Sequence, residues 1–269
     1  MNSKVKRVKL YVKDTPKAHK IEKKVEKELL DNGFEIVDDS FDLAISIGGD
    51  GTFLKMVHET NFNFNIHYAS INAGSLGFLS SIHEEQIEVF IQNLKSNLYM
   101  IQELNVLKSK VFYQNHSEEY YCINELVIRK KDFSSLRCNI FIDEVVFNKF
   151  VGDGLVISTA IGSTAYNMAL GGSIIDSTIN AFSLTPIAPI NNKVYRSFTN
   201  SLVFNSNRKV IVILNDKNNV SILCDGKIDN LENVKKIECQ LNDKCIKCIM
   251  PSDYNHINNI KSKVIDVLK

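Results

Sequence analysis

The stretch Leu43-Ala-Ile-Ser-Ile-Gly-Gly-Asp-Gly-Thr52 decides the fold of this 269-residue chain, because an apolar run gives way there to a helical pattern. Residues 43–47 predict a buried strand, and Phe53–Glu59 predict a helix. Glycines at the junction let the backbone turn sharply, and the amides that open the helix can bind a phosphate. Asp50 adds a carboxylate, which is costly beside phosphate unless it binds a metal or accepts a proton. We therefore expect this loop to be catalytic.

Strands and helices alternate along the first hundred residues. A strand over Val5–Val12 precedes a helix that starts at Thr15-Pro16 and stops at Gly33, as capping chemistry predicts. This alternation predicts a mostly parallel sheet with helices on its faces, in which ligands bind beyond the carboxyl ends of the strands. The other elements expected here are strands Phe34–Val37 and Ile66–Ile71, a helix over Glu84–Leu94, and a buried helical stripe of Ile21, Val25 and Leu29.

After Leu98 the pattern changes to short runs that are rich in β-branched and aromatic residues and are separated by turn residues, as in an all-β domain. A short helix is expected at Ser163–Leu170, inside the β region. The tail over Asp253–Leu268 has apolar residues at helical spacing. The expected strands are Val106–Tyr113, Glu119–Arg129, Asn139–Phe147, Leu155–Ser158, Leu202–Phe204, Val210–Leu214, Val220–Cys224, Lys236–Leu241 and Lys244–Met250.

Two domains follow from this change of pattern, and the fold class is α/β plus all-β. Residues 1–98 are expected to form an α/β domain that carries the glycine loop, and residues 252–269 are expected to pack back on it. Residues 99–251 are expected to form the β-rich domain.

The charge and the cysteines exclude several classes of protein. The chain has 32 basic and 31 acidic residues spread along its length, so it lacks an electrostatic footprint for nucleic acid. Apolar runs stay well short of the roughly 18 residues of a membrane span, and the N-terminus does not resemble a signal peptide. We expect a soluble, cytoplasmic protein whose six cysteines are reduced and mostly buried. Cys245 and Cys248 have the spacing of half a zinc site, but in a strand they point to opposite faces.

Five polar clusters lie outside the glycine loop, and each has a structural alternative. Asn72–Phe78 is either a glycine turn or a place of close ligand approach, and Asn124-Glu125 is either a strand edge or a site that binds hydroxyls. Gly152-Asp-Gly154 and Asp225-Gly226 resemble ordinary hairpin turns. The run Ser158–Asn167 gathers hydroxyls and free amides around Gly162, although helix capping explains part of it.

Taken in order along the chain, these motifs resemble those of the NAD kinase family. The glycine loop is shared with diacylglycerol and sphingosine kinases and, loosely, with phosphofructokinases, whereas the order and spacing of the later motifs are similar to those of NAD kinases. The likeness spans about residues 40 to 230. The motifs are Gly48-Gly-Asp-Gly-Thr52, Asn72-Ala-Gly-Ser-Leu-Gly-Phe78, Asn124-Glu125, Gly152-Asp-Gly154, Gly162-Ser-Thr-Ala-Tyr166, Ala188-Pro-Ile-Asn191 and Asp225-Gly226.

The resemblance implies an enzyme that transfers the terminal phosphoryl group of ATP, or of polyphosphate, to the 2′-hydroxyl of the adenosine ribose of NAD, giving NADP. It further implies a divalent metal, Mg²⁺, that assists the transfer. The implied fold has a Rossmann-like N-terminal domain and a β-sandwich-like C-terminal domain, and the implied assembly is a homotetramer or homodimer.

The motif match assigns roles to individual residues. Asp50 would be the general base on the 2′-hydroxyl, and Lys55 would bring a basic side chain to the dinucleotide. Asn124 and Glu125 would bind NAD through hydroxyls or base edges, and Asp153 would hold the other end of the dinucleotide. A protein metal ligand is not assigned. The other binding candidates are Gly49, Gly51, Phe78, Ser163, Thr164, Ala165, Tyr166, Asn167, Ala169, Ala188 and Lys227.

One departure from the family pattern leaves alternatives open. Many members carry Pro-Thr where this chain has Ala160-Ile161, so the turn before Gly162 is expected to be less rigid and to lack a hydroxyl. A non-catalytic dinucleotide sensor is one alternative, and a lipid kinase that shares the glycine loop is another. The lipid kinase is disfavoured because the sequence lacks a basic amphipathic helix. A P-loop enzyme is excluded because the Gly-x4-Gly-Lys-Ser/Thr pattern is absent.

Overall fold

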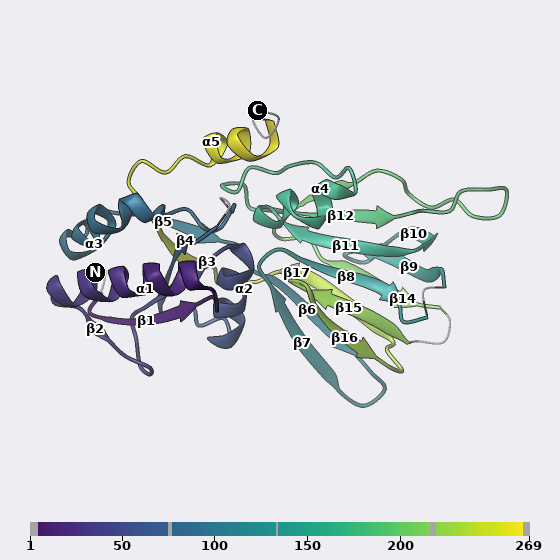
Figure 1. Ribbon diagram of the computed structural model, residues 1–269. Coiled ribbons are helices and arrows are strands. Elements are labelled where there is room, and N and C mark those ends of the chain that lie inside the picture. The colour runs from purple at the N-terminus through teal and green to yellow at the C-terminus, as the bar shows by residue number, and fades with distance from the viewer. Residues whose placement is uncertain (1–4, 75–76, 133, 216–218, 266–269) are drawn as a thin grey trace. The chain divides into compact units, whose positions relative to one another are not determined.

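The computed structural model describes residues 5–74, 77–132, 134–215 and 219–265 and divides into two compact units (Figure 1). The first unit comprises Met1–Leu104 and Cys245–Lys269, and the second comprises Asn105–Lys244. The expected boundaries, residues 98 and 252, differ from these. Strands β5 (Met100–Leu104) and β18 (Ile246–Met250) pair with each other, and β18 also pairs with β4 of the first unit. Both strands therefore belong to the first unit.

The first unit is built on a six-stranded sheet in the order β2-β1-β3-β4-β18-β5. Neighbouring strands are parallel from β2 through β18, and β5 is antiparallel to β18. Every residue of β3 is buried, as expected for a strand covered on both faces. The remaining strands of this sheet are β1 (Arg7–Val12), β2 (Glu35–Ile36), β3 (Leu43–Gly48) and β4 (His67–Asn72).

Helices cover both faces of this sheet (Figure 1). Helix α1 (Pro16–Asp31) is capped by the Thr15 side chain, which accepts from the Ala18 amide at 3.3 Å, and Gly33 follows it at φ +82°. These are the predicted start and stop. Helices α1 and α3 (Ile87–Ser96) share one core cluster with β3, whereas α2 (Asp50–Glu59) packs against the opposite face, where the Phe53 ring meets Tyr68. The tail adds α5 (His256–Ile260) and a π-helical turn, Lys261–Ile265.

The second unit consists of two six-stranded antiparallel sheets. The strand order is β10-β9-β14-β17-β6-β7 in one sheet and β13-β12-β11-β8-β15-β16 in the other. Apolar side chains from both sheets form a single core cluster, as alternating strands require when two sheets pack face to face. The strands are β6 (Leu107–Phe112), β7 (Ser117–Cys122), β8 (Glu125–Lys130), β9 (Leu136–Ile142), β10 (Val145–Gly152), β11 (Gly154–Thr159), β12 (Ala181–Ile187), β13 (Leu202–Asn205), β14 (Val210–Leu214), β15 (Val220–Cys224), β16 (Lys227–Leu231) and β17 (Lys236–Leu241).

A short helical segment covers the outer face of the second sheet. It consists of a 3-10 helix, Ile161–Thr164, and the one-turn helix α4 (Tyr166–Ala169), where a single short helix was predicted. Its Tyr166 packs against a small apolar cluster that includes Val127 and Val156, which point away from the main core. This segment carries several of the candidate binding residues.

Two strand predictions and one turn prediction in the second unit were wrong. The run expected as one strand from Glu119 splits at Asn124 into β7 and β8, which belong to different sheets. The run from Asn139 is also two strands, because Asp143 turns the chain at φ +55°. Gly152-Asp-Gly154 is not a hairpin turn: β10 lies in one sheet and β11 in the other, so the chain crosses between sheets there.

The cysteine prediction was correct for the buried free thiols and wrong for one pair. Cys138, Cys239 and Cys248 are free thiols buried among apolar side chains, as expected, and Cys245 is half-buried and lies outside the disulfide. Cys122 and Cys224, which were expected to be reduced, form a disulfide that links the end of β7 to the end of β15. Those strands lie in different sheets, so the bond joins the two layers. Across the described residues, helices long and apolar enough to cross a membrane are absent.

Candidate functional site

The glycine loop forms the sharp strand-to-helix junction that the sequence predicts. Strand β3 ends at Gly48 and helix α2 begins at Asp50, with Gly49 as the N-cap. The Gly49 carbonyl accepts from the Thr52 and Phe53 amides at 2.9 and 3.2 Å, so the first helical turn closes directly on the loop. Gly48 has no room for a side chain, because a Cβ there would overlap the Thr52 side chain. The loop thus presents the positive end of a ten-residue helix to any ligand beyond the sheet.

The Asp50 carboxylate is held by a second loop, which follows β4. Oδ2 accepts from the Phe78 amide at 2.7 Å. Oδ1 accepts from the Leu79 amide at 2.9 Å and from the amide and hydroxyl of Ser80 at 3.0 and 3.1 Å. The side chain is only half-buried. Asp50 therefore lies at the surface of the unit with a fixed orientation, rather than buried away from a ligand.

Gly77 makes this contact possible. A Cβ on Gly77 would overlap the Asp50 carboxylate and the Ser80 hydroxyl. Gly74, in the same loop, is exposed, and a Cβ there would meet nothing within 4 Å. The small size of Gly77 thus lets this loop contact Asp50, whereas close approach of a ligand to Asn72–Phe78 stays a prediction. Residues 75 and 76 of this motif lie outside the described residues.

Two other candidates of the first unit lie near this junction. Phe78 is half-buried, and its ring faces the ammonium of Lys263, which lies 4.3 Å from the ring centroid. Lys55 is one turn further along α2, with 73% of its side chain exposed, and its ammonium lies 3.6 Å from Glu59. Such a pair on a helix surface holds the side chain weakly, so Lys55 can turn to a ligand. Gly49 and Gly51 form the loop itself.

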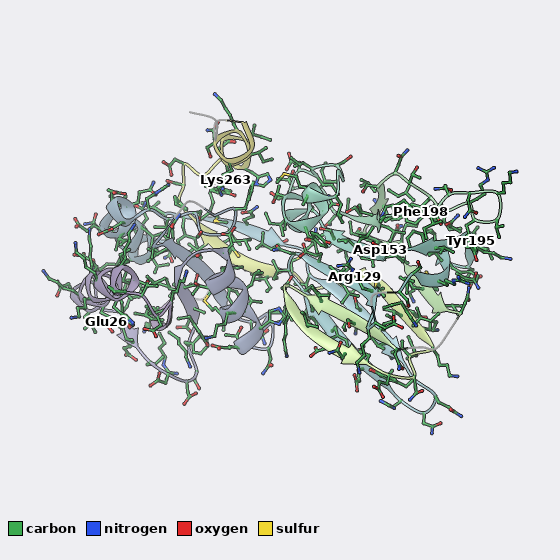
Figure 2. All side chains as sticks on the ribbon, turned by 45° about the vertical axis from the view of Figure 1, so that its right-hand side comes forward. Glu26, Arg129, Asp153, Tyr195, Phe198 and Lys263 are labelled. Atoms are coloured by element: carbon green, nitrogen blue, oxygen red, sulfur yellow. A yellow bond between two sulfur atoms is a disulfide. The ribbon has the colours of Figure 1, made fainter. Side chains whose placement is uncertain are left out.

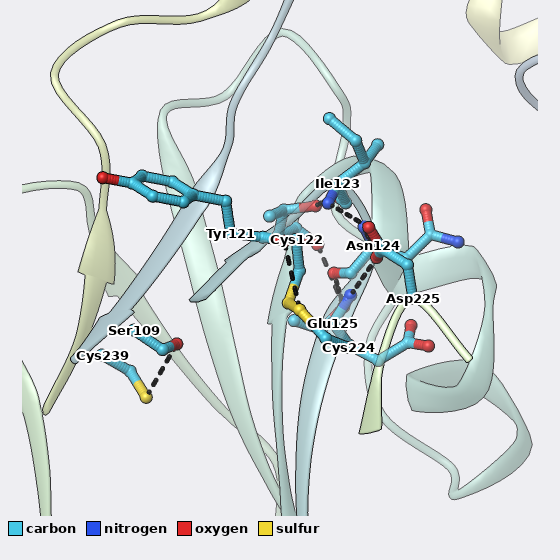
Figure 3. The surroundings of a disulfide bond; sticks show 11 residues. Ser109, Tyr121, Cys122, Ile123, Asn124, Glu125, Cys224, Asp225 and Cys239 are labelled. Atoms are coloured by element: carbon cyan, nitrogen blue, oxygen red, sulfur yellow. Dashed lines mark hydrogen bonds between the residues drawn. A yellow bond between two sulfur atoms is a disulfide. The ribbon is translucent and has the colours of Figure 1, made fainter. Parts of the chain in front are cut away.

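In the second unit, Asn124 and Glu125 lie where the chain passes from one sheet to the other (Figure 3). The Asp225 carboxylate accepts from the Ile123 amide at 2.8 Å and from the Asn124 amide at 2.7 Å. In return, the Asp225 amide donates to the Glu125 carbonyl at 3.2 Å. The disulfide between Cys122 and Cys224 joins the same two segments. The Asn124-Glu125 break is thus fixed by a disulfide and by a carboxylate from the β15–β16 turn.

Glu125 is a buried acid with one unsatisfied oxygen. Its side chain is 8% exposed, and its carboxylate accepts from the Tyr166 amide. Within the described residues, Oε2 has no hydrogen-bond partner. Burial and, to a smaller extent, the nearby Asp225 charge raise the pKa of Glu125 from its ordinary value of 4.5 to about 7. A buried polar atom without a partner is costly, and a ligand hydroxyl or amino group would satisfy it.

Several hydroxyl and amide side chains of the Ser158–Asn167 run are used internally. The Ser163 hydroxyl is fully buried, donates to the Ala160 carbonyl at 2.6 Å and accepts from the Ile175 amide at 2.9 Å. The Asn167 amide donates to the Ser163 and Ser173 carbonyls, and its oxygen accepts from Thr185 at 2.6 Å. These two candidates are therefore placed to hold the loop, since binding a ligand through their side chains would break these bonds.

The remaining residues of this segment differ in burial, and Thr159 and Gly162 contact Asn124. A Cβ on Gly162 would overlap the Asn124 backbone, and the Thr159 amide donates to the Asn124 carbonyl at 2.9 Å. The Thr164 hydroxyl is buried and donates to the Ile161 carbonyl at 3.0 Å. Ala165 and Tyr166 are half-buried and Ala169 is exposed, so these three keep accessible surface. Ala160 and Ile161, which depart from the family pattern, are both buried, and the turn forms with them in place.

The remaining candidates lie on exposed turns of the second unit. Asp153 is exposed at the crossing from β10 to β11, and its amide donates to the Ile187 carbonyl at 2.9 Å (Figure 2). Ala188 follows directly, is exposed and has φ +42°. Lys227 is exposed and faces Cys224 across the turn that carries Asp225. The structure thus gathers Asn124, Glu125, Gly162 and Tyr166 in one place and Asp153 with Ala188 in another.

Asp225 and Ser80 hold site residues in place, although the sequence motifs assigned neither of them a role in the site. Asp225 and Gly226 do form the predicted hairpin turn, with φ +49° and +84°. An Asp at a turn next to a buried strand often accepts hydrogen bonds from backbone amides. This pattern could have predicted that Asp225 holds a neighbouring segment. Nothing local in the sequence predicts its partner, which lies about one hundred residues earlier.

Comparisons with known proteins agree on one family. The model of the ATP-NAD kinase N-terminal domain matches residues 1–99, and that of the C-terminal domain matches residues 123–241. A protein of Finegoldia magna named NAD kinase is 35% identical over 98% of this chain and 100% of its own length. One of Streptococcus pneumoniae with the same name is 32% identical over 97% of this chain and 96% of its own length.

Solved structures show the same fold. Yeast NADH kinase complexed with NADH has a TM-score of 0.84 and 19% identity, covering 100% of this chain and 89% of its own. An NAD kinase from Archaeoglobus fulgidus in complex with ATP has a TM-score of 0.77 and 20% identity, covering 97% and 99%. With the curated relatives and the two domain matches, these findings show that the chain belongs to the NAD kinase family.

Proposed function

We propose that this phosphotransferase moves the terminal phosphoryl group of ATP, or of polyphosphate, to the 2′-hydroxyl of the adenosine ribose of NAD. The observation that carries this proposal is the fixed Asp50 carboxylate at the start of α2, beside a glycine loop suited to phosphate. The solved relatives with NADH and with ATP support both substrates. A ribose hydroxyl is a poor nucleophile at neutral pH, so it needs a base at the point of transfer.

The hydrogen bonds of Asp50 indicate which oxygen takes the proton. Oδ1 already accepts three hydrogen bonds, which occupies its lone pairs, whereas Oδ2 accepts one, from Phe78. Oδ2 can therefore accept a hydrogen bond from a ribose hydroxyl without losing its existing donor. Fixing the carboxylate in this way supplies positioning, which contributes to catalysis in addition to the proton transfer itself.

Mg²⁺ would bind at this site together with ATP, the phosphoryl donor. Mg²⁺ usually binds to one or two carboxylates together with substrate phosphates and water. Groups of three or more His, Cys, Asp or Glu that could hold a metal are absent from the described residues, so phosphate oxygens of ATP and water would supply most of its ligands. When bound with ATP, the ion would offset the charge of the phosphate oxygens.

The second unit supplies the proposed dinucleotide site. Glu125 Oε2, which has no partner within the described part of the chain, is suited to accept from an NAD hydroxyl or exocyclic amine. Asn124 lies beside it, and Tyr166, which is half-buried, provides an aromatic ring for stacking. Asp153 and Ala188 provide a carboxylate and a backbone contact for another part of the dinucleotide.

Finer features of the protein are proposed with this function. The parallel sheet of the first unit supports a Rossmann-like description, and the two sheets around one core support a β-sandwich-like one. Edge strand β10 exposes consecutive apolar residues, which supports a homodimer or homotetramer. We also propose a cytoplasmic location, where NAD and ATP are available as substrates.

The test of the function is direct. Purified protein is incubated with NAD, ATP and Mg²⁺, and NADP is measured with an NADP-specific dehydrogenase. We expect NADP to accumulate, and polyphosphate in place of ATP defines the donor. Thermal stabilisation by NAD without any NADP would indicate a dinucleotide sensor instead, and product from diacylglycerol alone would indicate a lipid kinase.

A further inference from the structure

The C-terminal segment brings a lysine to the loop that holds Asp50. Lys263 lies in the π-helical turn that continues α5 (Figure 2). The Asn255 side chain caps α5 by accepting from the Ile257 and Asn258 amides at 2.9 and 3.2 Å. Tyr254, just before the cap, accepts from the Asn259 side chain at 3.4 Å. These contacts fix the start of the helix that carries Lys263.

The Lys263 ammonium is buried with its hydrogen-bonding capacity unused. Nζ lies 4.3 Å from the centroid of the Phe78 ring, which attracts a cation through its π-face. Among the residues that the structure describes, Nζ has no hydrogen-bond partner. An ammonium has three N–H donors, and burying them without acceptors is costly. A ligand that brings a hydrogen-bond acceptor to Nζ would remove this cost.

The position of Lys263 links it to the reaction rather than to the tail alone. The Phe78 residue under the ammonium donates its amide to Asp50 Oδ2 at 2.7 Å. Burial lowers the pKa of Lys263 to about 8, and Asp50 is the charged group that acts on it in the opposite direction. At neutral pH the side chain is thus a cation, beside the carboxylate that is to take the ribose proton.

On the basis of the proposed function, we propose that Lys263 is a phosphate-binding residue whose ammonium donates hydrogen bonds to the phosphoryl group during its transfer. In this step the ribose oxygen bonds to the terminal phosphorus while the bond from phosphorus to the bridging oxygen of ATP breaks. The hydroxyl proton goes to Asp50, and ADP leaves. Lys263 exchanges no proton and offsets the negative charge of the phosphoryl oxygens.

A purely structural role makes a different prediction. If Lys263 only anchored the tail on the Phe78 ring, replacing it would lower stability and would affect both substrates alike. A phosphate-binding lysine instead acts on the donor selectively. Its loss weakens the binding of ATP and slows transfer, while NAD binds as before.

The test replaces Lys263 by methionine, which keeps an unbranched side chain on the Phe78 ring. Lys261→Met, an exposed lysine of the same turn, is the matched control. Tripolyphosphate binding is measured by calorimetry without NAD, and kcat/KM is measured separately for ATP and NAD. We expect kcat/KM for ATP to fall about 100-fold in Lys263→Met. Its tripolyphosphate affinity should fall with it, while its NAD affinity and the control stay near wild type.

The pH profile gives a second readout that a structural role would not move. Wild-type kcat/KM for ATP should decline above about pH 8 as Lys263 loses its proton. Lys263→Arg, which keeps its charge, should extend activity to higher pH. Lys263→Met with near wild-type tripolyphosphate affinity and kcat/KM for ATP would overturn the proposal, and so would equal losses for ATP and NAD with a lowered melting temperature. Neither result would affect the proposed function, which fails only if the wild type makes no NADP.

Discussion

Asp50 is the residue on which the chemistry depends, and its surroundings were not visible in the sequence. The glycine loop predicted the strand, the turn and the helix that carry it, because these follow from local patterns of apolar residues and glycines. The hydrogen bonds to Phe78, Leu79 and Ser80 come from a loop about thirty residues away. Such contacts depend on how β3 and β4 pair, which local patterns do not determine.

Gly77 offers a test of that contact at the residue scale. In Gly77→Ala the new Cβ would collide with the Asp50 carboxylate, so the carboxylate or the loop must shift. A displacement of this size at the reacting group is expected to lower kcat about 100-fold with a smaller change in KM. Gly74→Ala is the matched control, because the space around Gly74 is open. Equal activity of the two variants would show that the Gly77 contact does not set the position of Asp50.

Glu125 gives a prediction on pH. Its folded-state pKa is raised to about 7 from 4.5, so the fold favours the protonated form. Protonated Glu125 therefore adds its full contribution to the free energy of unfolding below about pH 4.5. This contribution is lost as the pH rises through about 7. The free energy of unfolding of Glu125→Gln should lack this loss, which for the wild type is on the order of 3 kcal/mol. Parallel pH profiles of the two proteins across this window would contradict the assignment.

At the scale of the elements, strands were predicted better than the connections between them. Helix α1 was predicted with its ends because Thr15, Pro16 and Gly33 act locally. Strand β12 was missed because it contains Pro186, which normally argues against a strand. Its partner β13 pairs only with residues 181–184, so Pro186 lies past that ladder and its missing N–H costs nothing there.

The break at Asn124 shows a second limit of local patterns. Residues on both sides have strand character, so the sequence predicted one strand from Glu119 to Arg129. The structure divides it between two sheets, and Asp225 fixes the break by accepting the Ile123 and Asn124 amides. That partner comes from a distant turn. The candidate residues were found from motifs, whereas the contacts that position them were not.

The disulfide joins two elements and can be tested as such. Cys122 and Cys224 are separated by 102 residues, and a disulfide typically stabilises a fold by about 2 to 4 kcal/mol. A reductant should lower the free energy of unfolding by that amount and raise the KM for NAD, since the bond adjoins Asn124 and Asp225. A Cys122→Ala/Cys224→Ala variant should not respond to reductant, whereas Cys138→Ala, which removes a free thiol, should respond as the wild type does. A wild type that is insensitive to reductant would show that the bond does not contribute in solution.

At the scale of the whole molecule, the exposed edge of strand β10 favours assembly into a homo-oligomer. Strand β10 is at the edge of its sheet, and Val145 and Val146 are 68% and 61% exposed. Exposed apolar residues on an unpaired strand edge favour pairing with another chain. We expect light scattering to show a homo-oligomer and Val146→Lys to shift it toward monomer. Ile257→Lys, an equally exposed apolar site on α5, is the control and should leave the mass unchanged. A monomeric wild type would contradict this prediction.

The central claim is that Asp50 takes the proton of the ribose hydroxyl, and Asp50→Asn tests it most directly. The amide keeps an oxygen for the Leu79 and Ser80 donors but cannot accept a proton, while Ser80→Ala removes one donor and leaves the base in place. The measurement is the rate of NADP formation at saturating ATP and NAD, together with NAD affinity by calorimetry. We predict that Asp50→Asn binds NAD within a few-fold of wild type and loses about 10²- to 10⁴-fold in turnover, while Ser80→Ala loses far less. Near wild-type NADP formation by Asp50→Asn would contradict the account.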